Sequence, residues 1–532
     1  MNYRKPSGGR PVAFLPMILA AVLLLPATVA AQTRRSSKTR LSRDEQIEAA
    51  LRKRTQKIQD QYCRDLVRVA NWAALQGLKK DAGALVDRIR KINPSYSKLD
   101  AVVEKIEKAE EESDAGKNEK NGKSLITRLK SADKKQGSEL VKLATGCMKV
   151  GLFTRAFDMI SHVIEISPDD SKARKILGFK KDIKTKEWIS SWEYYHRKKN
   201  FLTKEGWFEK KKKKDFDKGL RPYKGKWLSA EREKSIRTRN EYAPYTVKSE
   251  HFEVQTNMGR ERAWEFALKL EDFYTQFFRV FIGYYDQIAG AKLLFNRPDL
   301  KKMHLVILFP SRNDYLTHVK QEKGNDKLLR ESAGFYSGSD RKSRFYWSDN
   351  EEETYRTFYH EVAHQLFAET KATRSSGSRG TNWVVEGIAV YIETWKKIKG
   401  SWIPGHEIDG NRMKMAQRFL AANGNWSLQG FAHIDNEQFH KVNRGLNYCL
   451  AGALCHFFMH YNDEIYKEDF VRFLSAYYMG KISNDSLAEF IKVEGGGGFN
   501  TLEKQFKEYM ATLGQEKPEA EEEEEADDPL DE

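Results

Sequence analysis

An ungapped internal repeat in the first third of the chain is the strongest constraint on its fold. The segment LVRVANWAALQGLKKDAGALVDRIRKINPSYSK, which begins at Leu66, aligns without gaps with LVKLATGCMKVGLFTRAFDMISHVIEISPDDSK, which begins at Leu140. Small residues let paired helices approach, a Gly-Leu pair suits the turn between them, and a proline closes the second helix. The repeat therefore predicts two helical hairpins. The shared positions are Leu66/Leu140, Ala70/Ala144, Gly77/Gly151, Leu78/Leu152, Ala82/Ala156, Ile92/Ile166 and Pro94/Pro168.

Each copy resembles a tetratricopeptide helical hairpin, with a further helix expected to begin at residues 173–178. The resemblance predicts a helical region over residues 32–180. The two copies flank the charged stretch 104–135 and are fewer than the three stacked repeats that a solenoid usually needs. Two interpretations therefore stay open, a surface that binds a protein partner and a helical spacer packed on its neighbours.

The first residues have the organisation of a secretory signal. Three basic residues, Arg4, Lys5 and Arg10, precede the apolar run 12–25, and small residues follow at 29–31. We therefore predict a signal peptide over residues 1–31, a secreted or periplasmic protein, and no retained transmembrane helix. An uncleaved anchor is the minority alternative, because the apolar run is short for a spanning helix.

The remaining composition indicates several domains. A chain of 532 residues exceeds what one core usually holds. Removal of the signal lowers the formal net charge from +16 to +13, a balance that favours weak association with acidic polymers or an anionic envelope surface. We expect the acidic tail, residues 516–532, to be disordered. The four cysteines are too few for a disulfide scaffold, so we expect core residues at Cys63, Cys147, Cys449 and Cys455.

Residues 181–240 form a segment rich in tryptophan and lysine. Trp188, Trp207 and Trp227 follow each other at intervals of about 20 residues, around the lysine run 210–214. We predict small strand-turn units, each burying one tryptophan beside a solvated lysine face. Stacking of aromatic residues on single-stranded nucleic acid is the alternative, but export disfavours it, and acidic glycans or the envelope are the better partners.

Residues 241–515 have the pattern of an α+β domain. Strands are expected at 251–257 and 303–310, with an amphipathic helix over 260–282 between them. The segments AGFYSG and SRFYWSD predict two further strands joined by a polar turn near 339–342. The second of these, residues 343–349, is expected at a sheet edge, where an extended peptide could pair with it.

Metal chemistry is indicated directly after these strands. His360 and His364 are four residues apart in HEVAH, so a helix places both imidazoles on one face, with Glu361 next to the first. Glu386 follows early in a second helix that begins near residue 382, and Gly387 beside it would permit close helix packing. Two histidines and one glutamate are a zinc ligand set that leaves the fourth position for water.

HEVAHQL followed by WVVEGIAVYIE resembles the gluzincin metallopeptidases, and residues 241–513 resemble the peptidase MA-like domains of exported bacterial proteins. The resemblance implies a thermolysin-like domain with one zinc ion held by His360, His364 and Glu386. It also implies hydrolysis of a peptide or protein substrate by a zinc-activated water, with Glu361 as general base. The chain lacks a Gly-x-Met-Glu-Asn segment before the zinc helix, which favours an endopeptidase over an aminopeptidase.

Other residues have weaker assignments. By analogy with related peptidases, Tyr448 is the candidate that stabilises the oxyanion and His456 its competitor, although a core role is as well supported for either. Glu393 could orient a ligand histidine, but a solvated helix surface is the preferred interpretation. The alternative function is a non-catalytic gluzincin-like scaffold that binds partners through its helical repeats.

Overall fold

The computed structural model divides into two compact units, Met1–Leu177 and Gly178–Glu532. The expected signal peptide and acidic tail lie outside the described residues. The tryptophan- and lysine-rich segment belongs to the second unit. The described residues are 43–110, 115–150, 152–239, 243–285, 303–323, 332–369, 383–398, 400–406, 408, 410–480, 487–491, 493 and 497–514.

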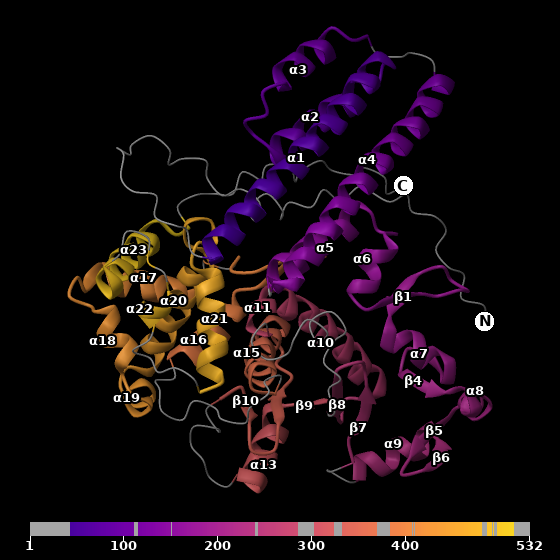
Figure 1. The fold of residues 1–532 in the computed structure, drawn as a ribbon. Coiled ribbons are helices and arrows are strands. Elements are labelled where there is room, and N and C mark those ends of the chain that lie inside the picture. The colour runs from indigo at the N-terminus through magenta and orange to yellow at the C-terminus, as the bar shows by residue number, and fades with distance from the viewer. Residues whose placement is uncertain are drawn as a thin grey trace, which may run out of the picture. The chain divides into compact units, whose positions relative to one another are not determined.

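The first unit is helical, as the repeat predicts (Figure 1). Equivalent helical hairpins are formed by α1 with α2 and by α4 with α5. The small residues that the two copies share, Ala70, Ala82, Ala144 and Ala156, are fully buried. The turns are also equivalent, because the N–H of Leu78 donates to the carbonyl of Ala73 and that of Leu152 to Cys147. The helices are α1 (Arg43–Leu75), α2 (Lys79–Ile92), α3 (Leu99–Glu107), α4 (Ala115–Lys149), α5 (Phe153–Ile166) and α6 (Ser171–Ile176).

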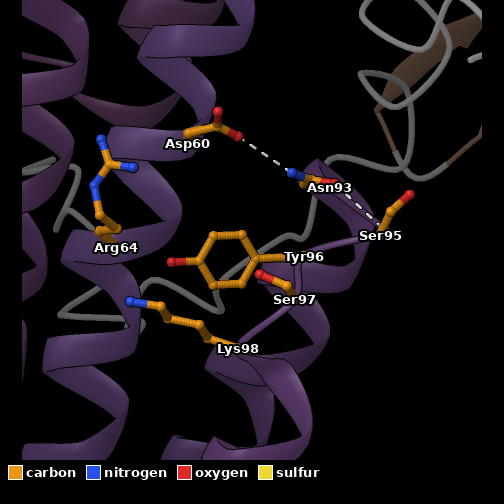
Figure 2. Close-up of a pocket in the computed structure, with 7 residues that line it drawn as sticks. All are labelled: Asp60, Arg64, Asn93, Ser95, Tyr96, Ser97 and Lys98. Atoms are coloured by element: carbon orange, nitrogen blue, oxygen red, sulfur yellow. Dashed lines mark hydrogen bonds between the residues drawn. The ribbon is translucent and has the colours of Figure 1, made fainter.

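A polar pocket of about 320 Å³ opens in this unit between α1 and the loop from α2 to α3 (Figure 2). Asp60 and Arg64 of α1 line one side, and Asn93 with residues 95–98 lines the other. The Asn93 amide donates to the Asp60 carboxylate at 3.3 Å, which ties the loop to the helix. Protein binding by the helical repeats stays a prediction.

The tryptophan- and lysine-rich segment folds as three antiparallel hairpins, each followed by a helix, so the predicted strand-turn units are present. The tryptophans are only half-buried, and the buried apolar side chains of these strands are instead Ile189 and Phe208, at 7% and 6% exposure. The expectation of one buried tryptophan per unit is therefore wrong. The elements are β1 (Phe179–Lys181), β2 (Trp188–Ser190), α7 (Ser191–Lys199), β3 (Asn200–Thr203), β4 (Gly206–Glu209), η1 (Lys210–Lys212), α8 (Lys213–Asp217), β5 (Leu220–Tyr223), β6 (Lys226–Ser229) and α9 (Ala230–Arg239).

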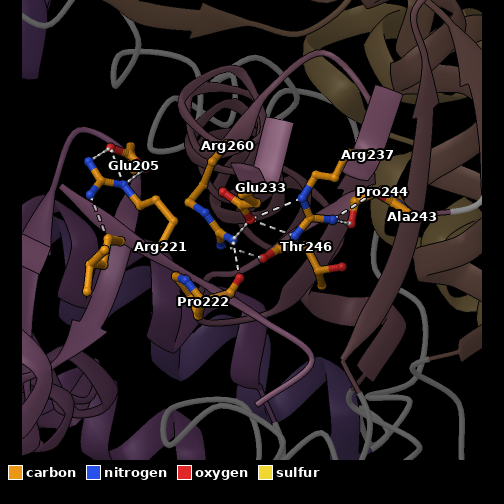
Figure 3. Close-up of polar contacts among 10 residues, drawn as sticks. Glu205, Arg221, Pro222, Glu233, Arg237, Ala243, Pro244, Thr246 and Arg260 are labelled. Atoms are coloured by element: carbon orange, nitrogen blue, oxygen red, sulfur yellow. Dashed lines mark hydrogen bonds and ion pairs between the residues drawn. The ribbon is translucent and has the colours of Figure 1, made fainter. Parts of the chain in front are cut away.

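Buried ion pairs join the third hairpin unit to the following domain (Figure 3). Glu233 of α9 accepts hydrogen bonds from Arg237 at 2.7 Å and from Arg260 at 3.2 Å, and its side chain is 4% exposed. The Arg260 guanidinium also donates to the carbonyl of Pro222 in β5. A carboxylate shared between two arginines offsets charges that burial would otherwise destabilise, so these contacts tie α9 and β5 to α10.

A mixed five-stranded sheet, in the order β10-β11-β9-β8-β7, forms the base of the last domain. The pairs β8–β9 and β9–β11 are parallel, whereas β10 and β7 pair antiparallel at the two edges. The residues predicted as an edge strand form β11, which lies inside the sheet between β10 and β9, so that prediction is wrong. The strands are β7 (Tyr245–Lys248), β8 (Phe252–Thr256), β9 (His304–Phe309), β10 (Gly334–Ser337) and β11 (Lys342–Tyr346).

Helices surround the candidate site, with α15 packed on the sheet and on α16, and α16 packed on α20 (Figure 1). Gly387 of α16 makes the last contact possible, because a Cβ there would lie 2.5 Å from the carbonyl oxygen of Ala451 in α20. The remaining elements are α10 (Arg260–Val280), α11 (Ile282–Tyr285), α13 (Arg312–Lys323), α15 (Glu351–Glu369), α16 (Trp383–Glu393), β12 (Lys396–Ile398), β13 (Ser401–Ile403), α17 (Asn411–Ala422), α18 (Leu428–His433), α19 (Asn436–Lys441), α20 (Arg444–Glu464), α21 (Lys467–Tyr478), α22 (Leu487–Phe490) and α23 (Gly498–Thr512).

Two further expectations concern the whole chain. All four cysteines are free and buried, which confirms their assignment as core residues. In the described part of the chain, every helix falls short of the length or the apolar character that crossing a bilayer requires.

Candidate metal centre

The helix α15 presents the two histidines of the motif. Its first turn is capped by Asn350, whose side-chain oxygen accepts from the N–H groups of Glu352 and Glu353. Val362 and Leu366, on the opposite side from the histidines, are fully buried. His360 and His364 therefore share the face that is turned toward α16, where their side chains are only 12% and 13% exposed.

Glu386, in the first turn of α16, completes a triangle with these histidines. The Nε2 atoms of His360 and His364 are 3.1 Å apart, and each is 3.4 Å from Oε2 of Glu386. A tetrahedral metal with bonds of about 2.0–2.1 Å holds its ligand atoms about 3.3–3.4 Å apart. The three side chains predicted from sequence thus lie together with the spacing that a zinc ion requires. Among the described residues, this is the one such group of histidine, cysteine and acidic side chains.

Glu393 holds the first histidine in place. It lies on the same face of α16 as Glu386, two turns later, and its Oε1 accepts a hydrogen bond from Nδ1 of His360 at 2.7 Å. Its side chain is 8% exposed, and Arg412 lies 3.4 Å from its other oxygen. The preferred sequence interpretation, a solvated helix surface, is therefore wrong. A carboxylate on Nδ1 fixes the ring so that Nε2 faces the metal position.

Glu361 lies beside the triangle and against the edge strand β10. The backbone N–H of Tyr336 donates to its carboxylate. Burial raises the pKa of Glu361 above its usual range, against the opposing effect of His360 and His364. Gly334 lets the strand approach this closely, because a Cβ there would be 3.1 Å from the Thr357 side chain of α15.

Charges around the triangle favour a cation at its centre. Burial acts to lower the pKa of His360, but hydrogen bonds to Glu386 and Glu393 outweigh it and raise that pKa to about 10. Burial acts to raise the pKa of Glu386, yet His364 and His360 hold it well below its usual range. Three carboxylates around two imidazoles thus stabilise positive charge at this point.

Tyr448 lies at the triangle and His456 does not. Tyr448 lies close enough to Glu386 to interact with it, and burial, together with the Glu386 charge, raises the pKa of the Tyr448 hydroxyl above its usual range. His456 lies about two turns further along α20, where it donates from Nε2 to the carbonyl of Gly405 at 3.0 Å and accepts from the Tyr509 hydroxyl at 2.7 Å. Both of its ring nitrogens are therefore used in the core, so Tyr448 is the better candidate of the two.

Two arginines beside Tyr448 were not identified from sequence. The guanidinium carbons of Arg412 and Arg444 lie 5.9 Å and 5.7 Å from the centre of its ring. Arg412 comes from α17 and Arg444 from the start of α20, and neither belongs to a motif. The one available signal for Arg444 is its helical spacing of four residues from Tyr448.

The chain was also compared with known proteins. It matches no protein-family model, and neither a curated protein nor a solved structure is significantly similar to it.

Proposed function

We propose that this chain is a zinc-dependent peptidase that cleaves within polypeptides and acts after export from the cell. The observation that carries the proposal is the triangle of His360, His364 and Glu386, because its spacing fits one tetrahedral ion with an open fourth position. Glu361 next to this position has no ligand role in the triangle, which suits it to proton transfer.

Zinc bound there supplies Lewis acidity, which makes water nucleophilic near neutral pH and polarises a carbonyl group. The Glu361 carboxylate accepts the proton of the attacking water and passes it to the leaving amine. Tyr448, from the facing helix, donates to the oxygen that becomes negatively charged. Glu393 contributes indirectly by fixing the His360 ring.

The edge strand β10 supports a polypeptide substrate. It pairs with β11 on one side, and along its other side the N–H of Tyr336 reaches Glu361. An extended peptide that pairs antiparallel or parallel with this edge would bring its carbonyl groups past the general base. The predicted pairing of substrate with residues 343–349 is thus replaced by pairing with residues 334–337.

The test compares Glu361→Gln with the wild-type chain on an unbiased peptide library, with products read by mass spectrometry. General base catalysis contributes about 10²–10⁴-fold, so cleavage should fall by this factor while the zinc content stays unchanged. Glu352→Gln, an exposed change on the same helix, is the control and should cleave normally.

Two results would contradict the proposal. Glu361→Gln that cleaves as fast as wild type would remove the general base from the reaction. A wild-type chain that binds zinc and cleaves no peptide would instead support the alternative of a non-catalytic scaffold that binds proteins. Export is tested separately, by sequencing the N-terminus of the secreted protein, which should begin near residue 32.

A further inference from the structure

A basic rim begins at Tyr448, beside the candidate metal centre, and continues along α17. We define it as Arg412 and Arg444, together with Arg418, which lies about 9 Å further along α17 than Arg412. Arg412 and Arg444 lie over the Tyr448 ring, and Arg412 is 45% exposed. Arg418 is an exposed residue on α17, a helix whose sequence, NRMKMAQRFLAA, contains no acidic residue. Such a rim attracts negatively charged ligands, and more strongly at low ionic strength.

The C-terminal end of α23 lies against α17, the helix that carries Arg412 and Arg418 of this rim. The side-chain amide of Gln417 in α17 donates to the carbonyl oxygens of Met510 and Leu513, both at 2.9 Å. A Cβ on Gly514 would lie 3.4 Å from the Ile408 side chain, in the loop that precedes α17. The exit point of residues 515–532 is thus fixed against α17 and its preceding loop.

The segment that begins at this point is strongly acidic and within reach of the rim. Residues 515–532 contain eleven acidic residues and one lysine. Ile408 precedes Arg412 by four residues, so at most about 14 Å separates their Cα atoms. Eight residues of extended chain from Gly514 span about 26 Å. Several tail carboxylates can therefore meet the rim without any movement of the fold.

We propose that the basic rim is a binding site for acidic peptide segments and that residues 515–532 of this chain are its first occupant. A tail bound there competes with acidic polypeptides for the rim beside the candidate peptidase site, which makes them the favoured ligand class. This inference rests on the proposed function only where it calls the occupied site a peptidase site.

The hairpin region, residues 178–239, is the competing destination for the tail. It holds 21 basic and 9 acidic residues, so its formal net charge is 21 − 9 = +12. The rim is favoured because the exit at α17 keeps the tail close to it, and a short tether gives an effective concentration in the millimolar range. Charge reversal at the rim and at the hairpins distinguishes the two destinations.

The test uses the full-length chain and a full-length variant in which the eleven tail acids are replaced by Gln or Asn. A fluorescein-labelled peptide of residues 515–532 is titrated into each, and binding is followed by fluorescence anisotropy. The neutral-tail chain should bind the peptide at least about tenfold more tightly than wild type, because its own tail no longer occupies the rim. Binding should weaken as salt is added.

Charge reversal locates the site in the neutral-tail background. Arg418→Glu and Arg444→Glu together should weaken peptide binding at least about tenfold, and Arg418→Glu alone, which leaves the contacts of Tyr448 intact, should weaken it measurably. Lys224→Glu with Lys226→Glu, at a hairpin turn, should change it less than about twofold. Loss of binding only in the hairpin variant would overturn the proposal, as would equal binding by wild type and neutral-tail chains.

The same titration with Glu361→Gln separates this inference from the peptidase proposal. Peptide binding by that variant should equal that of its parent, whether or not either chain cleaves peptides. Cleavage without peptide binding would overturn the tail site alone, and binding without cleavage would overturn the peptidase alone.

Discussion

Replacement of Gly387 by alanine tests how the contact between α16 and α20 positions the site. The new Cβ would lie 2.5 Å from the carbonyl oxygen of Ala451, where ordinary contact begins near 3.4 Å. This oxygen belongs to the backbone and cannot rotate away, so the helices must separate by up to about 1 Å. Overpacking of this kind costs about 1–3 kcal/mol, and alanine returns at most about 1 kcal/mol in helix propensity. We expect a net loss of about 1–2 kcal/mol.

The assay is hydrogen exchange of the α16 amides in the full-length chain, which reports the free energy of local opening. Gly445→Ala is the matched control on α20, because a Cβ there meets no atom within 4 Å. It should leave the opening free energy unchanged or raise it by up to about 1 kcal/mol. If Gly387→Ala opens no more often than wild type, the account of this helix contact is wrong. Because Glu386 and Tyr448 lie on the two separated helices, cleavage should also fall, by up to about 100-fold.

Three further changes probe other contacts. Glu393→Gln should lower zinc affinity about 10- to 100-fold, measured by chelator competition, because the neutral amide no longer orients His360 with a charge; unchanged affinity would contradict this. Burial lowers the pKa of His456 from its ordinary value of 6.5 to about 4, so the folded state binds this proton only at a lower pH than the unfolded state does. The free energy of unfolding is therefore unaffected by this group above pH 6.5, and it falls by up to about 3 kcal/mol as the pH drops toward 4. His456→Gln should flatten this slope in urea titrations, and an identical slope would refute the assignment. Glu233→Gln should destabilise the junction at α9 by about 3 kcal/mol, because two buried arginines lose their carboxylate, whereas exposed Glu231→Gln should not.

The candidate metal ligands could be predicted from the sequence because their pattern is local. The spacing of His360 and His364 on one helix is decided by the helical repeat alone, and Glu386 is marked by its position in a second amphipathic segment. The helical hairpins of the first unit were likewise predictable, since their small residues and turns recur at a fixed offset.

Other features depend on contacts between distant segments. Glu393 is buried because α15 lies over its face of α16. The sequence of α16 alone carries no information about this contact. The place of residues 342–346 inside the sheet depends on a parallel pairing with β9, more than 30 residues earlier. Arg412 reaches Tyr448 from another helix. In each case the local sequence pattern is compatible with a buried and with an exposed position, and tertiary packing decides between the two.

Metal analysis of ligand variants is the most direct test of the central claim, that His360, His364 and Glu386 form one zinc site. Wild type and Glu361→Gln, each purified with excess zinc and then dialysed, should retain about one zinc ion per chain. His364→Ala and Glu386→Ala should lose it while their circular dichroism stays that of a folded chain. Zinc retained at the wild-type level in Glu386→Ala would contradict the claim.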